Sequence, residues 1–239
     1  MKLSILVPVY NERRLLPAVL GKVASALPGV EKEVVLVDDG SADGTREWIQ
    51  ANLCGGNGPV EPYNRLAFRV VLHDRNEGKG AAIRTATRAA SGDVLVIQDA
   101  DLEYDPKDLE PMWRLIADGH ADVVYGSRFY GRPHRCLYFH HYAANKLISV
   151  LFSVLYNQTL SDLEVCYKMF RREVLHHLSL RSNDFGFEIE FSANIARAKN
   201  LRIYEVGVSY FGRTYAEGKK ISWKDGFKAL WYVLRFRFA

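Results

Sequence analysis

The stretch EVVLVDDGSADGT, residues 33–45, changes abruptly from an apolar run to polar, turn-forming residues. An unbroken run of Val and Leu is typical of a parallel strand that is buried on both of its faces. The Asp, Gly and Ser residues that follow favour a turn and the N-terminal cap of a helix. We therefore predict a strand over residues 33–39, followed at once by a helix over residues 41–53.

The same alternation of strand and helix patterns runs through the first half of the chain. Further strands are expected over residues 2–10, 68–74, 93–99 and 121–127, and helices over residues 11–27, 79–90 and 106–119. Buried strands separated by helices indicate a parallel sheet that is covered on both faces. The sequence thus predicts an α/β protein with a doubly wound, mostly parallel sheet.

The second half of the chain is less regular. It predicts helices over residues 138–157, 187–200 and 222–238, a strand followed by a helix within residues 166–175, and a strand over residues 201–210. We find no repeat, low-complexity tract or linker, and so expect a single domain over residues 1–239.

Composition excludes several classes of protein. The three cysteines are odd in number and far apart, which fits reduced thiols in a cytosol, and no Cys/His spacing suggests zinc. A formal net charge of +4 is too mild to call for nucleic acid as a partner. We recognise no signal peptide, and the longest apolar run, residues 147–156, is about half the roughly 20 residues that span a bilayer.

Chemically reactive or polar residues follow each of the first four predicted strands. They form the segments PVYNE (8–12), DDGSADGT (38–45), NEGKG (76–80) and QDAD (98–101). In open α/β sheets, ligands bind beyond the carboxyl ends of the strands. The convergence of the four segments there predicts one site. The extra acid of the Asp38-Asp39 doublet suits a base N–H or a ribose hydroxyl, although Asp and Ser also serve as turn and cap residues.

The segment VIQDADLEYDP, residues 96–106, places acids at every second position after a strand. Asp99 and Asp101 can offer two hard oxygen ligands to Mg²⁺ or Mn²⁺, which commonly binds to one or two carboxylates and to substrate phosphates. The alternative is a turn whose acids cap the next helix. Asp105 is the better candidate for that cap, because Pro106 follows it.

The segment NEGKG, residues 76–80, resembles a dinucleotide fingerprint only in part. Gly78 and Gly80 lie between a strand and a helix, but the third glycine is replaced by Ile83. A lone GxG pattern is weak evidence, so an oxidoreductase is disfavoured. Lys79 fits a phosphate or nucleotide contact, with a solvated lysine as the alternative.

Taken in order, SILVPVYNE, VVLVDDGSADGT, NEGKG, VIQDADLEYDP and VVYGSRF resemble the inverting family 2 glycosyltransferases of the GT-A fold. The later segments SDLEVCYKMFRREVL, GFEIE and EVGVSYFGRTYAEGKKISWKDGFKAL are similar to the branch of dolichol-phosphate mannose synthases and polyprenyl-phosphate glycosyltransferases. The resemblance covers essentially the whole chain. It implies a nucleotide-binding half, residues 1–127, and an acceptor-binding half, residues 128–239, with a C-terminal amphipathic helix.

The resemblance also implies roles for individual residues. The nucleotide would contact Pro8, Tyr10, Glu12, Asp38, Asp39, Lys79, Asp99 and Ala100. Asp99, Asp101 and Glu103 would hold the divalent metal. Asp101, Arg213 and Lys219 would form the catalytic set, with the two cations facing the donor's phosphates. Arg128 would contact the acceptor's phosphate; where that branch often has a further arginine and a serine, this chain has Leu137 and His141, so Arg135 and His141 are the remaining candidates.

These roles predict transfer of a hexose from a GDP- or UDP-sugar to dolichyl or undecaprenyl phosphate. An anionic phosphate oxygen needs no strong general base, whereas a saccharide hydroxyl would need one, for which Asp162, Glu164 and Glu188 are candidates. The same fold acting on such a hydroxyl is therefore an alternative. A nucleotidyltransferase is a weaker one, because PVYNERR lacks the glycine-rich loop expected after its first strand.

The predicted C-terminal helix bears on location. Residues 212–239 contain seven Lys/Arg and two acids. Trp223, Phe227, Leu230, Trp231 and Leu234 form an apolar stripe, with Lys224, Lys228 and Arg235 on its flank. The helix either packs on the sheet through this stripe or lies on anionic lipid. We expect a cytoplasmic protein, peripheral on the inner face of the membrane or aided by a membrane partner.

Overall fold

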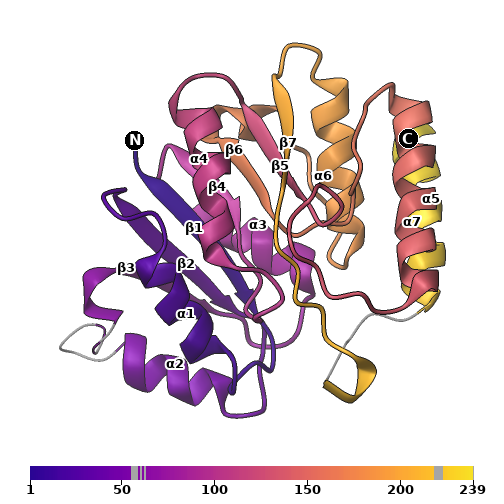
Figure 1. Ribbon diagram of the computed structural model, residues 1–239. Helices are drawn as coiled ribbons and strands as arrows, with labels where there is room; N and C mark the ends of the chain where they lie inside the picture. The colour runs from indigo at the N-terminus through magenta and orange to yellow at the C-terminus, as the bar shows by residue number, and fades with distance from the viewer. Residues whose placement is uncertain (55–58, 60, 62, 218–222, 239) are drawn as a thin grey trace.

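The computed structural model describes residues 1–54, 59, 61, 63–217 and 223–238. In this part of the chain, one sheet has the strand order β3-β2-β1-β4-β6-β5-β7 (Figure 1). The strands are β1 (Leu3–Val9), β2 (Lys32–Asp38), β3 (Ala67–Leu72), β4 (Val94–Ile97), β5 (Val123–Ser127), β6 (Lys168–Arg171) and β7 (Ile203–Gly207). Only β6 is antiparallel to its neighbours, β4 and β5, among these described strands. The predicted mostly parallel sheet is confirmed.

Helices cover both faces of the sheet, as predicted (Figure 1). They are α1 (Leu16–Ser25), α2 (Thr45–Leu53), α3 (Lys79–Ala89), α4 (Leu109–Ala117), α5 (Phe139–Tyr156), α6 (Gly186–Arg197) and α7 (Trp223–Phe238). Short 3₁₀ turns cover Tyr63–Arg65, Pro106–Asp108, Arg172–His177 and Tyr215–Glu217. α1 and α4 lie on one face, where Lys22 pairs with Asp105, and α3 and α6 lie on the other.

The core of the sheet comes from the apolar runs read in the sequence. Val34, Val35, Leu36 and Val37 of β2 are completely buried, as are the residues of β4. At about 25 cal/mol per Å² of apolar surface removed from water, such strands supply much of the stability of an α/β core. The central strands are thus held rigidly, and the polar residues that follow them are placed at one edge of the sheet.

The first helix begins later than predicted. Asn11 has a left-handed backbone with φ of 52°, and residues 13–15 form a turn that leads into α1, with the Leu16 amide donating to the Glu12 carbonyl at 2.9 Å. The Asn11 amide donates to Ser41 Oγ at 2.9 Å, and its side-chain oxygen accepts from the amide of Ala42 at 2.9 Å. These bonds join the loops after β1 and β2, two of the segments expected to form the site.

The C-terminal helix packs on other helices rather than on the sheet. α7 lies beside α5 and α6, and Figure 1 shows α5 and α7 side by side at the edge of the molecule. Its buried side is formed by Ala229 and Val233, whereas Trp231 and Leu234 of the predicted stripe are 53% and 45% exposed. Packing of this stripe on the sheet was therefore the wrong alternative.

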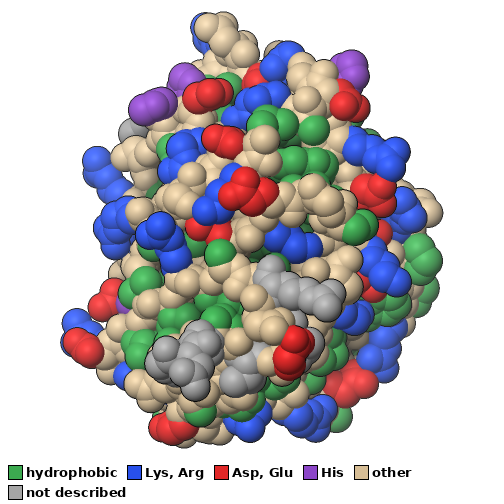
Figure 2. Space-filling model, turned by 90° about the vertical axis from the view of Figure 1, so that its left-hand side faces the viewer, with side chains coloured by type: hydrophobic (Ala, Val, Ile, Leu, Met, Phe, Trp, Pro, Cys, Tyr) green, Lys and Arg blue, Asp and Glu red, His purple; other side chains and the backbone are tan. Residues whose placement is uncertain are grey.

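Two surface properties bear on partners. None of the described helices combines the length and the hydropathy needed to cross a membrane. On the face that Figure 2 shows, Lys and Arg side chains are spread out with acidic side chains between them. The positive net charge therefore forms no continuous basic surface on that face.

Candidate active site

A cavity of about 840 Å³ lies beyond the carboxyl ends of β1, β2 and β4 and extends to α5 and α7. The structure brings most of the predicted site residues to it. Pro8, Tyr10, Glu12, Asp39, Lys79, Asp99, Ala100, Asp101, Glu103, Arg128, His141 and Arg213 all line it. Ligand sites in open α/β sheets lie in this position because parallel strands bring their loops together there.

Two of the predicted residues that the structure describes do not line this cavity. Asp38 is fully buried, and its Oδ2 accepts from Nε of Arg46 at 2.8 Å. Arg135 pairs with Glu217 at 2.7 Å outside the cavity. The structure therefore gives both residues other partners than the ones predicted. Lys219 lies outside the described residues, so its role stays a prediction.

Arg213 is the cation at the centre of the carboxylate cluster. Its Nη2 donates to Oδ2 of Asp101 at 2.7 Å, its Nε to Oε1 of Glu103 at 3.2 Å, and its Nη1 lies 3.4 Å from Glu12. The Arg213 amide also donates to Glu103, at 2.9 Å. The segment after β7 thereby closes over the loops after β1 and β4, which no local pattern could predict.

Lys79 opens α3 and points at the same cluster. Its Nζ lies 2.8 Å from Oδ1 of Asp99 and 3.1 Å from Oε1 of Glu188. Burial opposes the charge of this ammonium, but Asp99 and Glu188 outweigh it and raise the pKa of Lys79 well above its ordinary value. A permanent cation therefore lies next to Asp99, and the solvated-lysine alternative is wrong.

The cluster holds more negative charge than its own cations neutralise. Burial, together with the charges of Asp99 and Glu103, raises the pKa of Asp101 to about 7 in spite of Arg213. A divalent cation would relieve that repulsion, and carboxylate oxygens are suitable ligands for Mg²⁺ or Mn²⁺. Within the described ranges no three His, Cys, Asp or Glu side chains are arranged to hold a metal by themselves. Asp99 and Asp101 match the one or two carboxylates through which Mg²⁺ commonly binds beside substrate phosphates.

Asp39 organises the loop between β3 and α3. Its two carboxylate oxygens accept from the amides of Glu77 and Gly78, at 2.9 and 2.8 Å, and from Nδ1 of His73 at 2.8 Å. The doublet therefore has two roles: Asp38 binds Arg46 of α2, whereas Asp39 holds the rim of the cavity.

The glycines of NEGKG allow the backbone to pack closely. A Cβ on Gly80 would lie 2.2 Å from the carbonyl oxygen of Ser182, and one on Gly78 would lie 2.3 Å from that of Asn183. Gly78 also has a φ of 98°, which favours glycine. The Gly80 amide donates to Asn183 at 2.7 Å. The two glycines thus let the start of α3 pack closely against the segment before α6. This structural role explains the GxG pattern without dinucleotide binding.

Arg128 and Asp162 form a buried ion pair on the acceptor side. The Nε and Nη2 atoms of Arg128 donate to Asp162 at 2.7 Å each, and the Arg128 amide donates at 3.0 Å. Burial opposes ionisation of Asp162, but Arg128 outweighs it, and the pKa of that carboxyl is lowered. Arg128 also lies over the ring of Tyr210, 5.1 Å from its centroid. The guanidinium is held rigidly at the cavity wall.

The three candidate bases have different environments. Asp162 is occupied by Arg128, and Glu188 pairs with Lys79 and with the buried Lys168. Glu164 lines the cavity, and burial, aided by Asp162 and Glu188, raises its pKa to about 7 against the effect of Arg128. A pKa of about 7 suits Glu164 to act as a general base at neutral pH.

Sequence reasoning missed the apolar end of the cavity. Leu147 and Ile148 of α5 and Phe227 and Leu230 of α7 line it, far in sequence from the carboxylates. The stripe on α7 was visible, but the run over residues 147–156 gave no sign that α5 would lie beside it. Only the packing of the two helices creates this mouth.

Comparison with known proteins agrees with this geometry. The model of the family described as "Glycosyl transferase family 2" matches residues 4–179, about three quarters of the chain. The chain belongs to glycosyl transferase family 2. The predicted family is confirmed, and the nucleotidyltransferase alternative finds no support.

Two of the curated relatives are named as a dolichol-phosphate and an undecaprenyl-phosphate transferase. The chain is 29% identical, over 98% of its length, to a dolichol-phosphate mannosyltransferase of Pyrococcus furiosus. It is 28% identical, over 91% of its length, to an undecaprenyl-phosphate 4-deoxy-4-formamido-L-arabinose transferase of Photorhabdus laumondii subsp. laumondii. It spans only 63% and 62% of these two relatives.

Solved structures share the fold. Glucosyl-3-phosphoglycerate synthase from Mycobacterium tuberculosis, in complex with UDP, superposes with a TM-score of 0.71 at 20% identity, over 99% of this chain and 80% of that one. The complex of the same enzyme with Mn²⁺, UDP and glucosyl-3-phosphoglycerate gives 0.70 at 19% identity, over 99% and 79%. The predicted GT-A fold is therefore confirmed.

Proposed function

We propose that this family 2 glycosyltransferase moves a hexose from a nucleotide-diphosphate sugar to polyprenyl phosphate, with inversion at the anomeric carbon. The observation that carries the proposal is the two-ended cavity. Carboxylates and cations gather around Asp101 at one end, and apolar residues of α5 and α7 form the other. A water-soluble anionic donor and an amphiphilic acceptor need these two different surroundings in one site.

Donor binding would use the loops after β1, β2 and β4. Pro8, Tyr10, Glu12 and Asp39 lie along the wall that would contact the nucleotide. Cleavage of the sugar–phosphate bond leaves negative charge on the nucleoside diphosphate. Arg213 and Lys79 lie beside Asp101 and Asp99, where the diphosphate would bind. Preorganised cations that stabilise the developing charge of a leaving group usually supply a large part of the rate enhancement.

Asp99 and Asp101, with Glu103 beside them, would hold Mg²⁺ or Mn²⁺. The bound ion supplies Lewis-acid stabilisation of the leaving diphosphate. The raised pKa of Asp101 supports this assignment, since the cluster has an unneutralised charge. The Mn²⁺ in the complex of the structural relative, although only a fold-level likeness, points the same way.

On the acceptor side, Arg128 and His141 would contact the lipid's phosphate. Arg128 is oriented by Asp162, and His141 lies in the first turn of α5. The phosphate oxygen that attacks the anomeric carbon is already anionic at neutral pH, so no proton has to be removed. The names of the two curated relatives support a polyprenyl-phosphate acceptor.

The mouth of the cavity would face the membrane. The exposed residues Phe227, Trp231, Leu234 and Phe238 repeat along one side of α7, and Leu147, Val150 and Val154 along α5. Lys228, Arg235 and Arg237 flank the α7 stripe. Aromatic and basic residues on one helix favour an interfacial position on anionic lipid. We infer a peripheral attachment at the cytoplasmic face, where nucleotide sugars are available.

The direct test is transfer of label into lipid. The purified chain is incubated with GDP- or UDP-linked hexoses, Mn²⁺ and a polyprenyl phosphate, and organic-extractable label is counted. Label that depends on both the acceptor and Asp101 supports the proposal. The absence of lipid-linked product with every donor, from a protein that binds the nucleotide, would contradict it.

A second candidate is transfer to a saccharide hydroxyl, which the environment of Glu164 favours. Its raised pKa of about 7 suits a general base. The variant Glu164→Gln separates the two functions: transfer to a hydroxyl should fall by about 10²–10⁴-fold, whereas transfer to a phosphate acceptor should persist.

A further inference from the structure

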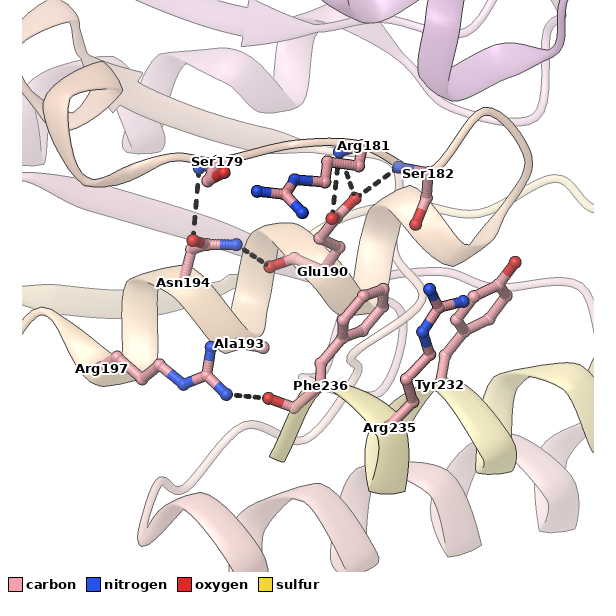
Figure 3. A pocket seen from close by; sticks show the side chains of 10 residues that line it. All are labelled: Ser179, Arg181, Ser182, Glu190, Ala193, Asn194, Arg197, Tyr232, Arg235 and Phe236. Carbon is pink, nitrogen blue, oxygen red and sulfur yellow. Dashed lines mark hydrogen bonds between the residues drawn. The ribbon is translucent and has the colours of Figure 1, made fainter. Parts of the chain in front are cut away.

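A second cavity, of about 350 Å³, lies between α6, α7 and the segment of residues 179–182 (Figure 3). It shares Tyr232 with the main cavity but none of the donor-binding carboxylates. Its volume is within the roughly 300–1,000 Å³ of small-molecule sites. None of the residues that line this second cavity has a role in the proposed transfer reaction.

Three arginines from three different elements line this cavity. Arg181 comes from the segment before α6, Arg197 from the last turn of α6, and Arg235 from α7. Figure 3 shows Arg181 and Arg235 extending into the space from opposite sides, while Arg197 donates to the carbonyl of Phe236. In the described part of the chain, none of the three is paired with a carboxylate. Guanidinium groups from three elements around one cavity can offer several N–H donors to an anion.

Glu190 is bonded to backbone amides rather than to the guanidinium groups of the arginines. It is the one acid among the described lining residues, and it is 4% exposed. Its carboxylate oxygens accept from the amide of Arg181 at 2.9 and 3.0 Å and from the amide of Ser182 at 2.7 Å. Glu190 therefore holds the backbone of the segment against α6, and the cavity keeps an excess of two positive charges.

The remaining polar groups are donors suited to phosphate oxygens. The hydroxyls of Ser179 and Ser182 line the cavity and take part in no hydrogen bond that the described residues record. A guanidinium presents several N–H groups in a plane, which matches phosphate in two-point contacts. Asn194, by contrast, is occupied, because it donates to the carbonyl of Glu190 and accepts from the amide of Ser179.

We propose that this cavity binds a phosphate ester, held mainly by Arg181 and Arg235. The phosphate belongs either to a soluble molecule or to the headgroup of an anionic phospholipid. The surroundings of Arg235 suit the headgroup: its guanidinium lies 4.8 Å from the ring of Trp231, on the exposed apolar stripe of α7. Binding of a phosphate ester in this cavity does not depend on the proposed sugar transfer. The binding assays below and the transfer assay above therefore test the two proposals separately.

The test compares two double variants of the full chain. Arg181→Gln with Arg235→Gln removes two charges from the cavity, and both side chains are exposed, so the fold should survive. Lys199→Gln with Arg237→Gln removes two charges from the same region without touching the lining. Calorimetry with sn-glycerol 3-phosphate measures the soluble source. Sedimentation with phosphatidylcholine vesicles, with and without phosphatidylglycerol, measures the lipid source.

We expect the cavity variant to bind at least one source about tenfold more weakly for each arginine removed. The control should bind glycerol phosphate as the wild type does. It should lose less vesicle binding than the cavity variant, because Arg237 flanks the α7 stripe, as Arg235 does, but does not line the cavity. Loss with glycerol phosphate identifies a soluble ester. Loss confined to phosphatidylglycerol vesicles identifies a headgroup. If the two double variants weaken binding equally, or if the wild type binds neither probe, the proposal is wrong. Circular dichroism and thermal midpoints of all variants verify that they are folded.

Discussion

Nη2 of Arg213 lies 2.7 Å from Oδ2 of Asp101, although the two residues are 112 positions apart in the chain. The contact joins the segment after β7 to the strand-end acids after β4. It brings a permanent cation to a carboxyl whose pKa is raised to about 7. The donor side of the site is thus assembled from both halves of the sequence, and its charges can be tested one at a time.

The substitution Asp101→Asn should reduce transfer by about 10²-fold or more, the size of effect seen when a preorganised charge-stabilising group is lost. The fold should survive, because the change relieves repulsion with Asp99 and Glu103. Transfer assays and thermal unfolding measure the two effects. Asp105→Asn is the matched control: it removes a carboxylate that caps the next turn through the Lys107 amide, and activity should remain.

Removal of divalent metal should abolish transfer reversibly. The carboxylate cluster needs a cation to bind a diphosphate, since both partners are anionic. We expect activity to disappear with EDTA and to return with Mn²⁺ or Mg²⁺, while the circular dichroism spectrum stays unchanged. Full activity after exhaustive chelation would exclude the metal role of Asp99 and Asp101.

Breaking the Arg128–Asp162 pair should destabilise the protein strongly. Asp162 is fully buried, so Arg128→Gln leaves an unpaired buried charge, and a cost of about 3–5 kcal/mol is expected. Adding Asp162→Asn should restore much of the stability but not the transfer to polyprenyl phosphate. Urea unfolding of the wild type, the two single variants and the double variant measures the coupling energy between Arg128 and Asp162. If the two single losses of stability simply add in the double variant, the predicted coupling is wrong.

Glu33 should make stability depend on acid pH. Burial opposes its ionisation, but Lys2, Ser4 and Ser91 outweigh it and lower its pKa from 4.5 to about 2. A lowered pKa in the folded state stabilises the protein above pH 4.5, and this stability is lost as the pH falls toward 2.

The matched variant is Glu33→Gln. At pH 7 it should unfold about 1–2 kcal/mol more easily, which is less than the full shift implies because Lys2 is partly exposed and solvent screens the pair. The difference from the wild type should shrink between pH 4.5 and 2. A difference that is independent of pH would show that packing, not ionisation, causes the loss.

Trp231→Ser should weaken attachment to vesicles. The side chain is 53% exposed on α7, and burying such a side chain in lipid is worth about 1.5–3 kcal/mol, or roughly tenfold or more in binding. Sedimentation with vesicles that contain phosphatidylglycerol measures the change. Tyr204→Ser, at a 44% exposed aromatic residue on β7, is the control and should bind as the wild type does.

Much of the fold could be predicted because its signals are local. The apolar run before Asp38 and the turn residues after it determine a strand and a helix through burial and backbone preference. The cap at Asp105 was predicted for the same reason, and its side chain accepts from the Lys107 amide. The start of α1 was not, because the left-handed turn at Asn11 depends on Ser41 and Ala42 of another loop.

The sequence by itself determined the alternation of strands and helices, the acids at the strand ends and the family. Tertiary structure decided the partners: Arg213 with Asp101, Lys79 with Glu188, Arg128 with Asp162, and Asp38 with Arg46 rather than with the cavity. It also decided that α5 and α7 lie together and form an apolar mouth. The physical reason is range. Backbone preference and burial act within a few residues of the chain, whereas ion pairs and cavities depend on which distant segments the packing brings into contact.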